Sequence, residues 1–273
     1  MKSIALPAPA KRFARLAPVL AIAAIAAGCA SVPNPNPADP WESYNRSMYQ
    51  FNDTVDRALL KPIASGYAQL TPKPAQTCIH NMFNNVFDVW SAFNSFIQGR
   101  GVDFINTLGR VLFNSTMGLG GCIDVASMNG STRIVNDFGV TLGVWGLKSG
   151  PYVVLPFLGP SSLRDGAGRA VDIFGGAATD MSITAITNIP LRNSLVGMGI
   201  IDARANLLSA DKLVNELALD RYSFIRDAYL QRRKSLVKGH EVQMNGAPDQ
   251  PEETLPDYSD DTAIPMPAKK AGQ

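Results

Sequence analysis

The segment AQTCIHNMFNNVFDVWSAFNSFIQ, residues 75–98, is the most unusual stretch of this 273-residue sequence. On a helical wheel its large apolar side chains cover an arc of roughly 180°, which predicts an amphipathic helix. They are Ile79, Met82, Phe83, Val86, Phe87, Val89, Trp90, Phe93, Phe96 and Ile97. The opposite side carries Asn81, Asn84, Asn85, Ser91 and Ser95, with Asp88 as its only charge.

This polar side lacks the Lys, Glu and Arg of an ordinary exposed helix face, and a helix that binds a membrane surface would also carry Lys and Arg there. Two interpretations remain. The helix is buried between protein layers, or its apolar side lies in lipid while its amide side faces a water-filled internal cavity. The segment taken alone favours the first interpretation.

The chain that follows is also apolar. Gly99 and Gly101 end the first helix, and a second is predicted from Val102 to about Phe113. The next segment, NSTMGLGGCID at residues 114–124, holds three glycines among Met, Leu and Ile. Such a segment has wide backbone freedom. It is interpreted either as a mobile element in an apolar setting or as a tight turn.

Towards the N-terminus, Asp39-Pro40-Trp41-Glu42 has the pattern of a capped helix start, with Asp39 as the cap. Pro62 and the run Thr71-Pro72-Lys73-Pro74 are expected to break the helical pattern. Apolar residues recur here at steps of three and four and so form one face of the predicted helix. We interpret this face as one that packs in the core. Its members are Trp41, Tyr44, Met48, Phe51, Val55 and Leu59.

In the second half, residues 133–147 are predicted to form a helix interrupted by glycines. Residues 150–160 contain three prolines, which cannot donate to a strand ladder, so a packed irregular loop is expected. Ser161 is predicted to cap the next helix, which Gly175-Gly176 would end. From about residue 200 to 238 the helices carry regular charges and are expected to face water. Residues 240–273 form an acidic, Pro-rich tail that is predicted to be disordered.

The first 28 residues are typical of a signal peptide, with basic residues before the apolar run Leu16–Ala27. The sequence Ala26-Ala27-Gly28-Cys29 resembles a bacterial lipoprotein signal. That resemblance implies cleavage before Cys29 and acyl chains on Cys29, although ordinary secretion with an incidental cysteine is the alternative. Ala30 and Ser31 then favour the outer membrane, and residues 29–38 would be an extended tether.

Composition excludes several classes of function. The net charge of +2 gives no general basic field for nucleic acid. No apolar run after Cys29 is long enough to span a bilayer. The chain has two histidines and lacks a G-x-S-x-G elbow and a P-loop, so no catalytic site, metal site or cofactor is expected.

Cys78 and Cys122 would lie in an oxidising compartment, where they could form a disulfide or remain separate buried thiols.

Several segments, in order, resemble the VacJ/MlaA family of outer-membrane lipoproteins. The resemblance runs from about Asp39 to Gly239. Cys78 and Cys122 are not hallmarks of that family. The matching segments are DPWESYNRSMYQFN (39–52), NSTMGLGGCIDV (114–125), FGVTLG (138–143), GPYVVLPF (150–157), Leu163-Arg164-Asp165, and Ile201-Asp202-Ala203-Arg204 through Tyr229.

The resemblance implies an all-α, ring-shaped bundle of amphipathic helices over residues 39–239. The ring would lie in the periplasmic leaflet of the outer membrane, around a central amphipathic channel and beside a trimeric porin. It would remove mislocalised phospholipids from the outer leaflet and pass them to a soluble periplasmic carrier. The competing hypotheses are a structural lipoprotein that tethers porins or cell wall, and an envelope hydrolase, whose acid, base or nucleophile we do not find.

By the same resemblance, the glycine-rich segment belongs to a hairpin that gates the channel. We expect Met117, Leu119 and Ile123 to form its apolar wall and Gly118, Gly120 and Gly121 its hinge. Phe51 and Asn52 would lie near the gate, and Asn81, Asn84 and Asn85 would face the channel. The only groups beyond the protein itself would be the acyl chains on Cys29 and the transported phospholipid.

Overall fold

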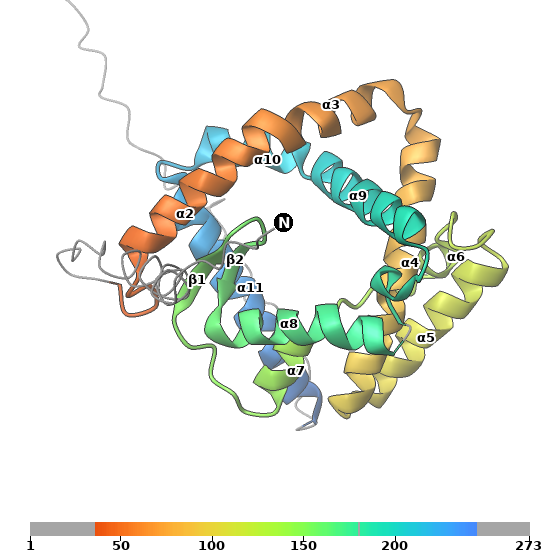
Figure 1. Ribbon diagram of the computed structural model, residues 1–273. Coiled ribbons are helices and arrows are strands. Elements are labelled where there is room, and N and C mark those ends of the chain that lie inside the picture. Colours follow the sequence, from red (N-terminus) through yellow and green to blue (C-terminus); the bar gives the residue numbers. More distant parts are fainter. Residues whose placement is uncertain (1–35, 180, 245–273) are drawn as a thin grey trace, which may run out of the picture.

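The computed structural model describes residues 36–179 and 181–244, and most of these residues are helical. Figure 1 shows the helices α2, α3, α4 and α8 arranged as a ring, with α5 and α6 outside α4 and α9 across one side. The elements are α2 (Glu42–Val55), the π-helix η1 (Asp56–Leu60), α3 (Lys61–Leu70), α4 (Lys73–Ile97), α5 (Gly101–Thr116), α6 (Val125–Met128), α7 (Phe138–Val144), β1 (Tyr152–Leu155), β2 (Gly159–Ser162), α8 (Leu163–Ala178), the 3-10 helix η2 (Ile183–Ala185), α9 (Ile189–Asn206), α10 (Leu208–Leu217) and α11 (Arg221–Met244).

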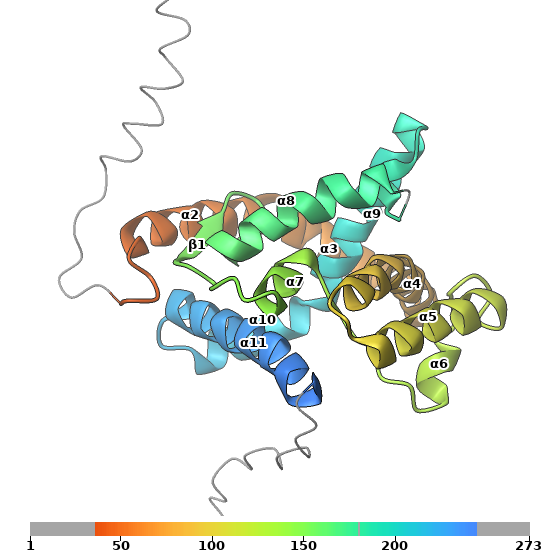
Figure 2. The same cartoon turned by 90° about the horizontal axis from the view of Figure 1, so that it is seen from below.

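The turned view of Figure 2 shows α10 and α11 on the opposite side of the molecule from α2 and α8. The all-α fold class is confirmed, with one two-stranded hairpin as a departure. No described helix is long and apolar enough to cross a membrane. The signal peptide 1–28, Cys29 and most of the predicted tail lie outside the described residues. The first residues of the predicted tail are helical, because α11 continues to Met244.

The helix predicted over residues 75–98 is present as α4, and α5 follows it as expected. The favoured interpretation of its two sides was wrong. Its polar side is the buried one, with Asp88 and Ser95 at 2% and 0% exposure, whereas Phe87 and Phe96 are 50% and 62% exposed. The helix is therefore not sandwiched between apolar layers, and its amide and hydroxyl groups point into the protein.

Two predictions near the N-terminus need correction. Asp39 does not cap α2; its carboxylate is fully buried and accepts hydrogen bonds from Asn45 and Tyr222. Pro62 does not break the helix, because it lies in the first turn of α3, directly after the π-helical η1. A missing N–H is tolerated there.

The apolar face predicted along residues 41–59 belongs only partly to the core. Met48 packs against the cluster around Tyr152, whereas Leu59 is exposed.

Residues 150–160 are not an irregular loop. They contain β1 and the first two residues of β2, and the strands pair in antiparallel register with Val154 opposite Pro160. Because no further described strand pairs with the outer edge of β2, a proline that cannot donate is accommodated there. Ser162, not Ser161, caps α8 by accepting from the Asp165 N–H. The helix predicted from Arg133 begins only at Phe138, and α8 continues through Gly175-Gly176 to Ala178.

Glycine allows α7 and α8 to pack with their backbones in contact. A Cβ added to Gly168 would lie 2.4 Å from the Gly139 nitrogen, whereas one added to Gly166 would lie 3.6 Å from Ser161 Oγ and meet nothing closer. We therefore expect Gly168→Ala to lower the free energy of unfolding by about 1–3 kcal/mol through overpacking. Gly166→Ala should raise it by about 0.5–1 kcal/mol, because alanine favours the helix. Urea unfolding of both variants checks this, and equal effects would contradict the packing.

Candidate functional site

A cavity of 610 Å³, here called the polar cavity, lies where segments distant in the sequence meet. Its wall combines Asn84, Phe87, Trp90 and Ser91 of α4 with residues 133–137, the start of β2, the inner side of α8, residues 181–184 and α11. Apolar and charged side chains both contribute. The arrangement is therefore an amphipathic space enclosed mainly by helices.

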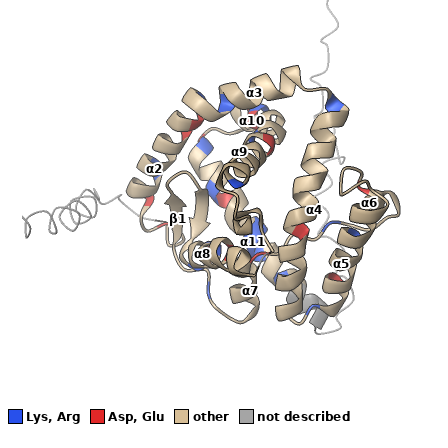
Figure 3. Cartoon of the chain, turned by 45° about the vertical axis from the view of Figure 1, so that its right-hand side comes forward, with Lys and Arg blue, Asp and Glu red and all other residues tan. Residues whose placement is uncertain are grey.

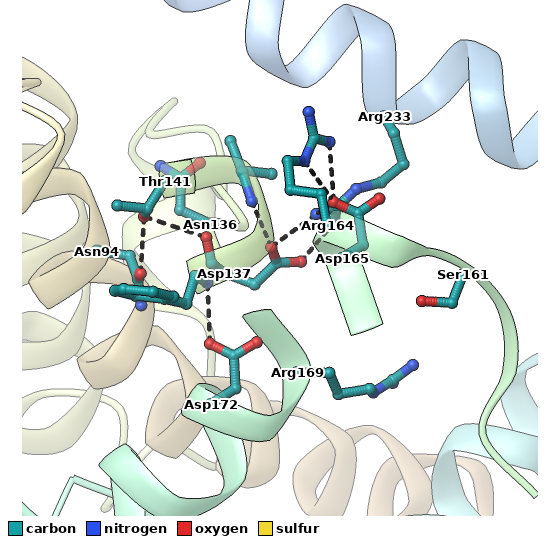
Figure 4. Close-up of polar contacts among 12 residues, drawn as sticks. Asn94, Asn136, Asp137, Thr141, Ser161, Arg164, Asp165, Arg169, Asp172 and Arg233 are labelled. Atoms are coloured by element: carbon teal, nitrogen blue, oxygen red, sulfur yellow. Dashed lines mark hydrogen bonds and ion pairs between the residues drawn. The ribbon is translucent and has the colours of Figure 1, made fainter. Parts of the chain in front are cut away.

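Ion pairs between α11 and the opposite wall fix one side of this cavity (Figure 4). Arg233 donates to both Asp137 oxygens, at 2.5 and 2.8 Å, and to Asp165 at 3.0 Å. Tyr229 and Arg164 also donate to Asp165. Burial alone would raise the pKa of Asp137 and Asp165, but the charge and hydrogen bonds of Arg233 hold both pKa values below their usual range. These carboxylates are therefore ionised and already neutralised by protein cations.

Asp172 contributes the third carboxylate of the polar cavity. It accepts from Trp90 Nε1 at 2.8 Å and from the Phe138 N–H at 2.9 Å. Burial raises its pKa, and these two hydrogen bonds only partly oppose that effect. Through these hydrogen bonds Asp172 joins α8 to α4 and to the start of α7. Its burial disfavours the ionised form of the carboxyl group.

Two cations of the polar cavity lack a carboxylate partner among the described residues. Arg133 pairs with Asp88 at 2.7 Å, and Arg233 pairs with Asp137 and Asp165. Arg169 makes only a long hydrogen bond, 3.4 Å, to the Leu158 carbonyl, and Arg232 makes no ion pair within the described chain. Figure 4 shows Arg169 apart from the paired carboxylates. In the described part of the chain, Asp172 is the one lining carboxylate without an ion pair, so these two cations leave the cavity with an excess of positive charge, which suits an anion.

A second cavity of 640 Å³, here called the apolar cavity, lies between α4, α5, η2 and α9. Its wall carries no charged side chain, and its polar lining residues are Asn85, Ser115 and Ser182. Met181 and Ser182 line both cavities. The two spaces are therefore neighbours with opposite chemistry.

Of the three predicted channel asparagines, only Asn84 lines the polar cavity. Asn81 donates to the Cys122 carbonyl at 3.0 Å and Asn85 to Ser115 Oγ at 2.8 Å, so both attach α4 to its neighbours. Asn52 donates to the Leu155 carbonyl and accepts from the Phe157 N–H, and Phe51 packs edge-on against Phe157. Asn52 and Phe51 thus hold the hairpin turn and line neither cavity.

The predicted gate residues form the loop between α5 and α6. Positive φ angles at Leu119, Gly120 and Gly121 make the turn, and Met117 and Leu119 are largely exposed. Figure 1 shows this loop beyond α4, away from the ring opening. None of Met117, Gly118, Leu119, Gly120, Gly121 and Ile123 lines either cavity. A gating role for them stays a prediction and would have to act through α4.

The cysteine pairing that the sequence left open is present: Cys78 of α4 and Cys122 of this loop form a disulfide. The bond closes a segment with a sequence separation of 44. Because it restricts the unfolded chain, the double variant Cys78→Ser/Cys122→Ser should lose about 2–4 kcal/mol of unfolding free energy. Denaturant unfolding measures the loss. Reduction of the wild-type protein should reproduce it, and an unchanged midpoint in both experiments would show that the disulfide contributes no stability.

Sequence reasoning missed the residues that give the polar cavity its charge. Arg169, Asp172 and Arg233 lie on two helices far apart in the sequence and meet only in the fold. The sequence pattern placed Trp90 among the apolar residues of its helix, whereas in the structure its indole N–H donates a hydrogen bond to Asp172. Within residues 36–179 and 181–244 no group of His, Cys, Asp and Glu is arranged to hold a metal ion.

Comparison with known proteins gives consistent matches. The family model described as MlaA lipoprotein matches residues 37–236. A protein of Escherichia coli K12, named intermembrane phospholipid transport system lipoprotein MlaA, is 33% identical over 221 residues, which cover 79% of this chain and 85% of the relative. The protein of the same name from Haemophilus influenzae Rd is 33% identical over 222 residues, covering 80% and 84%.

A solved structure is also similar. It is described as "Structural basis for maintenance of bacterial outer membrane lipid asymmetry" and is 32% identical in sequence, with a TM-score of 0.61. The match covers 73% of this chain and 98% of the solved chain. The similarity therefore extends over nearly the whole of that structure.

Proposed function

The chain belongs to the MlaA lipoprotein family, and from this we propose that it maintains outer-membrane lipid asymmetry by taking phospholipids out of the outer leaflet. It would act as a passage in a lipid transport system, without making or breaking a covalent bond. The relatives in E. coli and H. influenzae are named as parts of an intermembrane phospholipid transport system. The observation that carries the proposal is the polar cavity together with the exposed apolar sides of α4, which forms part of its wall, and of the neighbouring α5.

The outer surface suits hydrocarbon. On α5, Val102 is 82% exposed and Ile105 64% exposed, and Phe96 of α4 is 62% exposed. Figure 3 shows few charged positions along α4 and α5. Large exposed apolar patches mark contact with a membrane or another protein. We propose that this surface lies in the periplasmic leaflet, anchored by acyl chains on Cys29.

The polar cavity lowers the main barrier to lipid removal. A phosphate headgroup that enters hydrocarbon unpaired loses its hydration, at a cost of several kcal/mol or more. Arg169, Arg232 and the amide of Asn84 would replace part of that hydration. We propose two protein partners: a trimeric porin beside the ring, and a soluble periplasmic carrier that accepts the lipid.

Deletion of the gene tests this function. Phospholipid in the outer leaflet, measured with an amine reagent that does not cross the membrane, should rise in the deletion strain. The wild-type gene on a plasmid should restore it. An unchanged outer leaflet in the deletion strain would refute the proposal and favour a structural lipoprotein.

A further inference from the structure

The polar and apolar cavities share one stretch of wall. The proposed transport function does not by itself explain why two cavities of opposite chemistry should meet there. Met181 and Ser182 line both spaces. On α4 the two linings alternate, because Asn84 and Phe87 face the polar cavity while Phe83 and Val86 face the apolar cavity. A ligand that crosses the Met181 position would therefore pass from a charged environment to an uncharged one within a few atoms.

The polar side of this junction suits a phosphate group. Arg169 and Arg232 have no carboxylate partner in the described chain, whereas the carboxylates Asp137 and Asp165 are occupied by Arg233. Guanidinium groups bind phosphate oxygens through planar pairs of N–H donors. An anion at this position would be attracted by two cations. It would face Asp137 and Asp165, whose charge is already balanced, and Asp172, whose ionisation burial disfavours.

The apolar side suits a hydrocarbon chain. Ile79, Met82 and Val89 of α4, Ile183 of η2 and Leu195 of α9 contribute to its wall. Its volume of 640 Å³ lies within the roughly 300–1,000 Å³ typical of ligand cavities. A cavity with this lining holds water poorly, because few polar groups are available to bind it. Each methylene group that moves from water into it makes binding more favourable by about 0.8 kcal/mol.

We propose that the apolar cavity binds one acyl chain of a phospholipid whose phosphate lies beside Arg169 and Arg232, with Met181 at the bend between chain and headgroup. This inference rests on the proposed function and adds to it a defined site on the path. It commits to the lipid as the occupant because only an anion joined to a long chain satisfies both neighbouring linings at once. A flexible methionine at the junction can adjust to chains of different shape.

The consequence is that the lipid does not leave all of its hydrocarbon in the membrane while its headgroup crosses. One chain would be held by α4, η2 and α9 as the phosphate enters the polar cavity. The protein would then hold a whole phospholipid for a time, ready for transfer to an acceptor.

Two photoreactive phospholipids test the site in the full-length lipoprotein in nanodiscs. One carries a diazirine at the end of an acyl chain, and the other carries it beside the glycerol. Mass spectrometry of the labelled peptides should place the chain-end probe on residues 183–198 and the glycerol probe on the walls of the polar cavity, near residues 169 and 232. Labelling of both probes confined to the outer surface, at Val102 and Leu112, would overturn the proposal.

Variants make the test quantitative. Val89→Phe fills part of the apolar cavity and should lower chain-end labelling of residues 183–198 about tenfold, which corresponds to about 1.4 kcal/mol. Arg169→Gln should lower labelling by both probes. Val102→Phe is the matched control, because it adds the same volume to the exposed outer surface, and it should leave both signals unchanged. Melting temperatures confirm that each variant is folded, and Leu195→Trp replaces Val89→Phe if that variant is not.

The outcomes separate this inference from the proposed function. If Val89→Phe labels like the wild type while deletion of the gene still raises outer-leaflet phospholipid, the acyl-chain site is refuted and the transport function stands. If deletion leaves the outer leaflet unchanged, the transport function fails whatever the labelling shows.

Discussion

The Asp124→Ala variant is expected to lose about 3–5 kcal/mol of unfolding free energy, because it leaves a buried arginine without its counter-charge. The Arg110 side chain is 1% exposed, and its guanidinium lies 2.7 and 3.0 Å from the two Asp124 oxygens. Asn114 donates to the same carboxylate. Asp124 thus joins the end of α5 to the start of α6 and fixes both ends of the loop between them.

Glu42→Ala is the matched control for this prediction. Glu42 pairs with Arg46, whose side chain is 39% exposed, so its loss should cost less than about 1 kcal/mol. Urea unfolding at neutral pH compares the two variants. Equal losses would contradict the view that burial makes the Arg110–Asp124 pair important.

The Asp124 pair also predicts a pH dependence. Burial would raise the pKa of Asp124, but hydrogen bonds from Ser127, Asn114 and Arg110 together lower it to about 2. The unfolded carboxyl titrates near 4. The stabilisation is therefore complete above about pH 4 and is lost as the pH falls towards 2. The difference in stability between wild type and Asp124→Ala should shrink over that interval and stay constant between pH 5 and 7.

The second large effect is expected at Asp39, which joins the N-terminal segment to α11. Its carboxylate is fully buried and accepts from Asn45 at 2.7 Å, Tyr222 at 2.5 Å and Arg226 at 3.3 Å. Asp39→Ala removes all three interactions and should cost about 3 kcal/mol or more. Chemical denaturation of the purified protein measures this cost.

Asp227→Ala serves as the control at the same arginine. Asp227 pairs with Arg226 at 2.8 Å, but its side chain is 55% exposed. Its removal should cost less than about 1 kcal/mol. If Asp227→Ala is as damaging as Asp39→Ala, the closure of the ring does not depend on the buried carboxylate.

The sequence predicted which residues share each side of α4 but not which side faces inward. Helical periodicity separates Phe87 from Asp88 and Ser95, and nothing in it states whether the surroundings are water, protein or lipid. The usual rule that apolar sides are buried gave the wrong answer. The absence of Lys and Glu opposite the apolar side was the signal that the rule fails for this helix.

Other features depended on contacts between distant segments. The prolines at 151, 156 and 160 argued against strands, but only Pro160 lies within one, and Asn45 and Asn52 of α2 hydrogen-bond the backbone of β1. The polar cavity combines residues from α4, α8 and α11 with residues 133–137, so no local motif marks it. The family resemblance gave the helical ring and the lipid function, whereas the charges of Arg169 and Arg232 became visible only in the fold.

The most direct test of the central claim is to obstruct the polar cavity and measure phospholipid in the outer leaflet. Asn84→Trp places a large side chain in the wall of this cavity, and Gln231→Trp places the same side chain on the exposed surface of α11. Each variant is expressed at equal level in cells that lack the wild-type gene. Asn84→Trp should leave the outer leaflet as rich in phospholipid as in the deletion strain, and Gln231→Trp should restore it. Full restoration by both variants would show that lipid does not pass through this cavity.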